Sequence, residues 1–307
     1  MNVLKRTKKA SKKEVDAFKK WCDNLPHLKF NADEEWLVVF LHCCKFNLEK
    51  AKSKIENFYA MRHSMPELFT NRDPNLPKIQ EIIKKGLIVP IRQSESDQKI
   101  ILYFSFGDPE RYQIPLLLKA YFMALDVLLV EEATKFYEYD LLIDLKHFSP
   151  KYEAALTPNM LKILLGYFKD GHPLNVKDIH FINPPPYIMP TLNLVLLFTP
   201  DKRREKVRVF ILNTKRDANI YLQIHVHCEN EDFDVKTIYP LLERTFSPDD
   251  DGIRRVFDDA CVEWKLRMEN YRKWLMNSAF LFTMDMAQRP DDGKKFLNPF
   301  ALEEVNT

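Results

Sequence analysis

The chain has 307 residues, a formal net charge of +2, 46% hydrophobic residues and 29% charged residues. This composition is typical of a globular protein and excludes wholesale disorder, and the near-neutral charge argues against a dedicated nucleic-acid binder. The chain has only 6 glycines and neither a GxGxxG nor a GxxxxGKS/T motif, which weighs against the common classes of nucleotide enzyme.

The cysteines and the amino-terminal segment indicate the compartment. The five cysteines form no CxxC pair and their number is odd, which favours reduced thiols packed inside an intracellular protein. The first residues, MNVLKRTKKASKK, are basic but lead into no apolar stretch typical of a secretory signal. No apolar run reaches the roughly 18–20 residues that a spanning helix needs. We therefore expect a cytoplasmic protein.

The first part of the chain has helical periodicity from residue 12 to residue 65. Trp36, Phe40 and Cys43 follow the i, i+4, i+7 spacing of one helix face. Asn47 precedes the run LEKAKSKIENF and is a suitable N-cap for a second helix. This region is predicted to be a small all-helical module.

The central part of the chain alternates between strand-like and helical runs. Strand-like segments at 99–106, 139–145 and 176–183 are separated by helical segments at 114–136 and 157–170. Such a βαβαβ order predicts an α/β fold with a mostly parallel sheet and right-handed crossovers.

An apolar run follows the third strand-like segment. After three consecutive prolines, residues 188–198 are almost wholly apolar, and the run ends at Pro200, directly before the charged stretch DKRREK. A helix that is apolar all round is either a buried core helix or a lid that meets lipid on its outer face. The residues alone leave both interpretations open.

Signals for a metal site or an enzyme are weak. His225, His227 and Cys228 lie close together on a strand-like run, but no second ligand pair at metal spacing accompanies them. His180 continues an apolar strand pattern and is expected to be a hydrogen-bonded core histidine. We predict no metal, no cofactor and an ordinary strand at these histidines.

Three acidic residues could form an acid–base set. Asp126 lies inside an apolar helical run, and Asp140 and Asp144 flank one strand-like run. No GxSxG motif is present, and no serine or cysteine lies in a plausible nucleophile elbow. We favour capping or helix-pairing roles for these acids and expect a protein that is not an enzyme.

Three segments resemble the CRAL-TRIO family in their order. PHLKFNADEEWLVVFLHCCKFNLEKAKSKIENFYAMR is similar to the family's amino-terminal helical module. DGHPLNVKDIHFINPPPYIMPTLNLVLLFTPDKRREKV resembles its lipid-binding core, in which a strand and an INPP turn lead into a mobile gate helix and a basic run. QIHVHCENEDFDVKTIYPLL resembles the strand and helix that follow. The resemblance covers about 15–305, is greatest by pattern to the retinaldehyde-binding and tocopherol transfer proteins, and includes a tail similar to that of insect members.

The resemblance implies an architecture and a function. The expected parts are an amino-terminal helical module at 1–85, a CRAL-TRIO lipid-binding domain at 86–250 and a carboxyl-terminal helical segment and tail at 251–307. The expected function is to carry a hydrophobic lipid, of the terpenoid, tocopherol, retinoid or carotenoid class, in an apolar cavity under a gate helix. The cavity wall is predicted to contain Tyr103, Ile143, Phe148, Ile179, Phe181, Ile188, Leu192, Val195 and Phe198.

The resemblance also implies transient contact with anionic membranes, through Lys202, Arg203, Arg204 and Lys206. The sequence departs from the family where FLHCCKF replaces the usual basic FLRARKF, and where an added hairpin is predicted near 208–223. We expect a monomer that is peripheral to membranes and binds no nucleic acid. A phosphoinositide- or protein-binding scaffold of the same fold stays open as an alternative, and an enzyme acting on a lipid has no catalytic constellation behind it.

Overall fold

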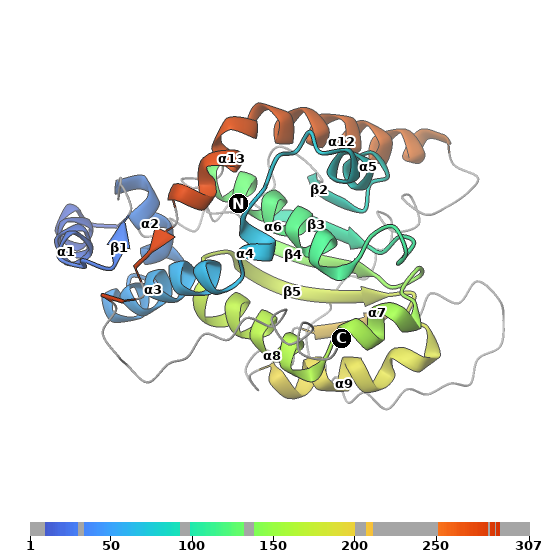
Figure 1. Cartoon of the computed structure of the whole chain (residues 1–307), viewed down its shortest axis with the longest axis horizontal. Coiled ribbons are helices and arrows are strands. Elements are labelled where there is room, and N and C mark those ends of the chain that lie inside the picture. The colour runs from blue at the N-terminus through green and yellow to red at the C-terminus, as the bar shows by residue number, and fades with distance from the viewer. Residues whose placement is uncertain are drawn as a thin grey trace, which may run out of the picture.

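The computed structural model is a mixed α/β structure with a helical module at its amino-terminal end (Figure 1). The predicted added hairpin, apart from β6 at its start, lies outside the described residues, as do the basic run, His225, His227 and Cys228. The structure describes residues 10–29, 34–92, 99–131, 138–199, 207–210, 251–281, 283–285 and 287–288.

The amino-terminal module consists of helices α1 (Lys12–Asp23), α2 (Glu34–Cys43) and α3 (Leu48–Ser64). As predicted, Asn47 caps α3, because its side-chain oxygen accepts a hydrogen bond of 3.0 Å from the Lys50 N–H. The rings of Phe40 and Phe58 meet edge to face and join α2 to α3. The helical prediction for this part of the chain is thus confirmed.

Two further elements tie this module to the other end of the chain. The short strand β1 (Leu28–Lys29) pairs antiparallel with β7 (Thr283–Met284). The short helices α4 (Pro66–Phe69) and α5 (Pro77–Lys84) then lead from α3 to the sheet. Both start with a proline, which the first turn of a helix tolerates.

Within the described residues, the main sheet has five strands in the order β2-β3-β4-β5-β6. Of these described strands, β2 alone is antiparallel to its neighbour, so the predicted mostly parallel sheet is confirmed. The predicted strand-like segments match three of these strands to within a residue or two. The bounds are β2 (Ile88–Arg92), β3 (Lys99–Ser105), β4 (Glu138–Asp144), β5 (Asn175–Ile182) and β6 (Val207–Phe210).

The crossover helices between the parallel strands cover one face of this sheet. The segment predicted as a single helix at 157–170 is not one regular helix in the structure, because α8 passes into a turn of π-helix, η1. Backbone carbonyls of η1 accept hydrogen bonds from side chains of α3. The crossover elements are α6 (Ile114–Glu131), α7 (Pro150–Ala155), α8 (Pro158–Gly166), η1 (Tyr167–Gly171), the 3₁₀ turn η2 (Pro186–Ile188) and α9 (Met189–Phe198).

The opposite face of the sheet is covered by α12 (Asp251–Asn270), which lies on the other side of the sheet from α8 and α9 (Figure 1). Phe257 and Cys261 of α12 pack on Tyr103 and its apolar neighbours on that face. Helix α13 (Arg272–Leu281) follows and leads back toward the amino-terminal module. The predicted boundaries after residues 85 and 250 stay predictions.

Candidate functional site

An apolar cavity of about 290 Å³ lies between the sheet and the crossover helices. The strands contribute two rows of three side chains across the sheet, Leu102, Leu141 and Ile179 in one row and Phe104, Ile143 and Phe181 in the next, and Val176 and Lys177 near the start of β5 line the cavity as well. The helical part of the wall comes mainly from Leu118, Tyr121, Leu161, Leu164, Leu165, Phe168, Leu192, Val195 and Phe198.

Strand alternation explains which residues face the cavity. Successive side chains of a strand point to opposite faces, so Ile179 and Phe181 of β5 share one face and His180 lies on the other. Ile143 and Ile179 are only half-buried although they stand on central strands covered by helices. The space above these two side chains is the cavity itself.

Helix α9 closes the cavity on the side opposite the sheet. Leu192, Val195 and Phe198 face inward at a spacing of three residues, which is one face of a helix. Leu197 points away, and its side chain is 62% exposed. The helix start is fixed by the Thr191 hydroxyl, which donates a hydrogen bond of 3.1 Å to the Glu153 carboxylate of α7.

Most of the side chains predicted for the cavity wall do lie in it. The residues in the wall are Ile143, Phe148, Ile179, Phe181, Ile188, Leu192, Val195 and Phe198, and their contact with a ligand stays a prediction. Tyr103 is a correction, because it lies on the face of β3 that packs against α12. Its hydroxyl donates a hydrogen bond of 3.0 Å to the Asp144 carboxylate there.

Sequence reasoning predicted the contribution of α9 but missed that of helices α6 and α8 and of several polar residues. The runs that form α6 and α8 are apolar on more than one face, so their periodicity did not show which side meets the cavity. The cavity is also lined by Cys43 of α2, Lys54 of α3, Lys169 of η1 and Lys177 of β5, so three of these four residues come from helical elements and not from the sheet.

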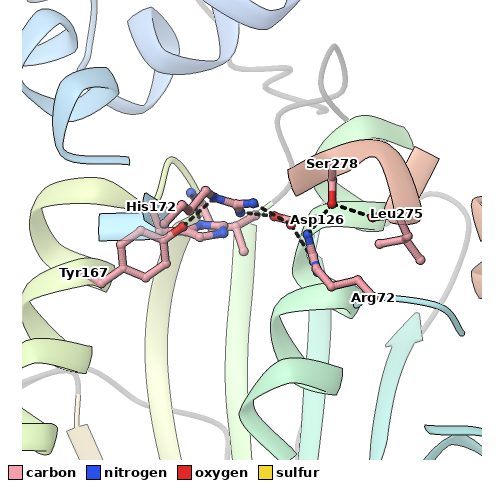
Figure 2. Close-up of polar contacts among 8 residues, drawn as sticks. Arg72, Asp126, Tyr167, His172, Leu275 and Ser278 are labelled. Carbon is pink, nitrogen blue, oxygen red and sulfur yellow. Dashed lines mark hydrogen bonds and ion pairs between the residues drawn. The ribbon is translucent and has the colours of Figure 1, made fainter. Parts of the chain in front are cut away.

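A buried ionic cluster connects the amino-terminal module to this site (Figure 2). The Asp126 carboxylate of α6 accepts hydrogen bonds from the Arg62 guanidinium of α3, one of them 2.9 Å long, and lies 2.7 Å from an Arg72 nitrogen. Burial alone would raise the pKa of Asp126, but these two guanidinium groups hold it below its usual value. The prediction that Asp126 pairs elements rather than transfers protons agrees with this geometry.

The same cluster reaches the cavity wall and the carboxyl-terminal helix. The Arg62 Nε–H donates to the Tyr167 hydroxyl of η1 at 3.1 Å, and the next residue, Phe168, lines the cavity. Arg72 donates to the Ser278 hydroxyl of α13 at 2.9 Å, as Figure 2 shows. The Asp126 carboxylate of α6 and its two arginine partners therefore connect α3, α6, η1 and α13.

The other two acids of the suggested acid–base set are also placed by the structure. Asp144 accepts hydrogen bonds from Tyr103 and from the Asn183 side chain at 2.9 Å, and Asp140 lies 3.9 Å from the buried His180 ring. All of them lie on the sheet face away from the cavity. These acids are not positioned to act on a molecule bound in the cavity.

The described side chains and helices also bear on metal binding and on membrane insertion. Within the described ranges, no group of three or more His, Cys, Asp or Glu side chains is arranged to hold a metal ion. Among the same residues, no helix is long and apolar enough to cross a membrane.

Comparisons with known proteins match both halves of the chain. Residues 7–79 match the family model "Pinta-like, UBA domain", and residues 84–234 match "CRAL/TRIO domain". Clavesin-1 of Xenopus laevis is 24% identical over 203 residues, which cover 66% of this chain and 60% of that protein. The human protein "Alpha-tocopherol transfer protein-like" is 25% identical over 162 residues, covering 52% and 47% of the two chains.

The matched part therefore spans about half to three-fifths of the length of these curated relatives. A solved structure, "Crystal structure of Sfh5", is also similar, with a TM-score of 0.45, 15% identity, and coverage of 66% of this chain and 82% of that chain. The family model, the mostly parallel sheet and the order of the sequence motifs agree. The chain therefore carries a CRAL/TRIO domain at residues 84–234, preceded by a Pinta-like UBA domain at residues 7–79.

Proposed function

We propose that this chain binds one small hydrophobic lipid in the cavity and exchanges it with cytoplasmic membrane surfaces. The observation that carries the proposal is the apolar cavity between the sheet and α9, with half-buried isoleucines at its centre. Ligand pockets of about 300–1,000 Å³ lined by apolar side chains are the usual sites for small molecules. The volume of about 290 Å³ suits a single chain or ring system rather than a two-chain lipid.

The energy of burial is sufficient without any catalytic group. Each CH₂ group removed from water contributes about 0.8 kcal/mol, so a terpenoid tail of about 15 carbons gains roughly 10 kcal/mol before its loss of freedom is counted. We propose a ligand of the terpenoid, tocopherol, retinoid or carotenoid class, and the name of the relative "Alpha-tocopherol transfer protein-like" supports the tocopherol member of this group. We therefore propose a carrier rather than an enzyme.

Helix α9 has the properties of a gate. Its inner face seals the cavity, while the exposed Leu197 gives its outer face an apolar contact for a bilayer. Pro190 lies at its first turn and Pro200 follows its end, so both ends of the helix are natural hinge points. The basic run after α9 would then meet an anionic membrane as α9 opens.

Cavity-filling variants test this function. The variant I179W places a large ring in the cavity, which should lower affinity for a fluorescent isoprenoid alcohol by at least tenfold without lowering the unfolding temperature. The control V262W makes a similar change at a side chain that is 60% exposed on α12, and it should bind like the parent. Unchanged binding by folded I179W would exclude the cavity as the site. A folded parent that takes up no apolar ligand would favour the scaffold alternative, which acts through a phosphoinositide or a protein.

A further inference from the structure

Cys43 and Cys44 place two thiols side by side at the cavity wall. Both cysteines are free thiols in the structure, and their sulfur atoms lie 3.8 Å apart, close to van der Waals contact. The Cys43 side chain is half-buried and lines the cavity, and its thiol lies 3.2 Å from the Phe40 carbonyl, to which it donates a hydrogen bond. A small molecule that enters the cavity therefore reaches one sulfur of an adjacent pair.

Cys44 differs from the buried thiols elsewhere in the molecule in its acidity. The pKa of Cys44 lies below its usual value, first because of the hydrogen bond with the Cys43 thiol and then, against the effect of burial, because of the charges of two lysines of α3. Burial raises the pKa of Cys22 to about 12 and that of Cys261 to about 11. Since the thiolate is the nucleophilic form of cysteine, Cys44 has a more reactive sulfur than Cys22 or Cys261.

A disulfide between these neighbouring residues would be strained. Consecutive Cα atoms lie about 3.8 Å apart, whereas a separation of about 4.4–6.8 Å is usual for a disulfide. Strained disulfides are easily reduced, and such bonds are labile or regulatory rather than structural. We therefore expect oxidation of this pair to be reversible.

The turn after α2 can accommodate such a bond. Cys43 is the last residue of α2, so closure of the bond changes the end of this helix and not its interior. Lys45 and Phe46 follow with φ angles of 53° and 59°, a left-handed conformation that is uncommon for residues other than glycine. Asn47 then caps the start of α3. The rearrangement is therefore confined to an already strained turn between two helices.

We propose that Cys43 and Cys44 form a reversible oxidation site at the cavity wall, a vicinal dithiol that hydrogen peroxide converts to a disulfide. The Cys44 thiolate attacks one peroxide oxygen, the O–O bond breaks, and a sulfenic acid and a hydroxide ion form. The Cys43 sulfur then displaces the sulfenic hydroxyl group, so that the S–S bond forms as the S–O bond breaks. The two thiol protons and the two hydroxides leave as two water molecules, and the two electrons lost by the sulfurs reduce the peroxide. This inference does not depend on which ligand the cavity holds.

Peptide mass spectrometry of the folded parent tests the site, because trypsin releases both cysteines in one peptide, residues 30–45, which contains no other cysteine. After a brief exposure of the reduced protein to hydrogen peroxide, this peptide should lose the mass of two hydrogen atoms and take up no iodoacetamide. Dithiothreitol should restore both thiols. Cys22 and Cys261 should be oxidised at least about tenfold more slowly, because their thiolates are suppressed by burial.

Substitutions assign the two steps to the two sulfurs. In C43S the serine hydroxyl can still donate to the Cys44 sulfur, so this variant should accumulate a sulfenic acid that dimedone traps, and C44S should accumulate much less. The control C22S removes a buried thiol elsewhere and should form the disulfide at the parent's rate. In urea, Cys22 and Cys261 lose their buried surroundings, so the preference for Cys44 over them should disappear. The parent peptide is analysed without any substitution, so an unstable variant does not affect that result.

Three results would overturn the inference. The first is a peptide that keeps both thiols at peroxide concentrations that oxidise Cys22 or Cys261. The second is oxidation that dithiothreitol does not reverse, or a disulfide from Cys43 or Cys44 to another cysteine, which would leave the pair as ordinary packed thiols. The third is an equal preference for the pair in urea, because the folded surroundings would then have no part in its reactivity.

Discussion

Asp126 lies on α6 with its side chain 1% exposed and two guanidinium groups against its carboxylate. Removing one partner of a buried pair is far more destabilising than the net contribution of the pair, because the remaining charges lose their compensation. Here the Asp126 carboxylate compensates the charges of two arginines, Arg62 and Arg72. The cluster is therefore the point in the described structure where a single neutral substitution should have the largest electrostatic effect.

We expect D126N to lower the free energy of unfolding by about 3 kcal/mol, because two buried guanidinium groups then face a neutral amide. Urea denaturation measures this loss. The control D170N changes an exposed acid on η1 and should stay within about 0.5 kcal/mol of the parent. A D126N protein as stable as the parent would show that other groups compensate the arginines.

His172 makes stability depend on pH. Burial, followed by repulsion from Arg62 and Lys54 and partly opposed by Asp126, lowers the pKa of His172 to about 3. The unfolded chain has a histidine pKa of about 6.5, so between pH 6.5 and pH 3 the unfolded state binds the additional proton. The stability that the neutral ring provides is present above pH 6.5 and is lost as the pH falls, by up to about 1.4 kcal/mol per pH unit.

The variant H172Q should remove this share of the pH dependence. Urea midpoints between pH 6.5 and pH 4 should fall less steeply in H172Q than in the parent, whatever its stability at pH 7. Exposed His147 provides the matched control, and H147Q should retain the parent slope. Parallel curves for H172Q and the parent would mean that His172 is already protonated in the folded protein.

Single residues also show where prediction from sequence ended. Tyr103 was placed in the wall because the run KIILYFSF is apolar on both faces, and nothing in it tells which face meets the cavity. Phe257 and Cys261, more than 150 residues later in the chain, cover the face of β3 that carries Tyr103, and this contact shows that the face is turned away from the cavity. Lys54 was missed for a related reason, since α3 meets η1 only in the folded chain.

At the scale of elements, the apolar run and its flanking prolines predicted the bounds of helix α9. The structure adds which face of α9 lines the cavity and which face is exposed. Val195 lines the cavity and is buried, whereas Leu197 points outward. The π-helical turn η1 was not foreseen, because Tyr167–Gly171 continues the helical pattern of α8 in sequence. Its side-chain bonds to Arg62 and its carbonyl bonds to Lys54 and Asn57 arise from contacts that a local pattern does not contain.

The two faces of α9 should separate transfer from retention. The variant L197S should slow transfer of a fluorescent ligand to liposomes several-fold while affinity in solution stays near that of the parent, because the lost contact is with the bilayer. V195S should weaken affinity instead, since it places a hydroxyl in the apolar wall. If L197S weakened retention as much as V195S does, the assignment of an inner and an outer face would be wrong.

At the scale of the whole molecule, the order of strand-like and helical segments was sufficient to predict the mostly parallel sheet. The basic run after α9 concerns the contact of the protein with membranes. Each basic residue near an anionic bilayer contributes about 1 kcal/mol, within a Debye length of about 8–10 Å. The run lies outside the described residues, so its role rests on its position in the sequence, directly after the proposed gate.

Replacing Arg203, Arg204 and Lys206 with glutamine should weaken binding to anionic liposomes by about two orders of magnitude, the equivalent of roughly 3 kcal/mol. Binding to neutral liposomes and the affinity for ligand in solution should not change. Added salt should weaken the parent's binding and leave that of the variant nearly constant. Equal binding of both proteins to anionic liposomes at low salt would show that the basic run is a hydrated surface without a role in membrane binding.

The central claim is that the chain carries one lipid in the cavity beneath α9. Native mass spectrometry of the protein purified from its own source tests this most directly, with I179W prepared in the same way. We expect the parent to carry a single additional mass, that of one lipid per chain, which organic extraction releases, and we expect I179W to lack it. A parent that has the bare chain mass, and keeps it after incubation with a total lipid extract, would contradict the account.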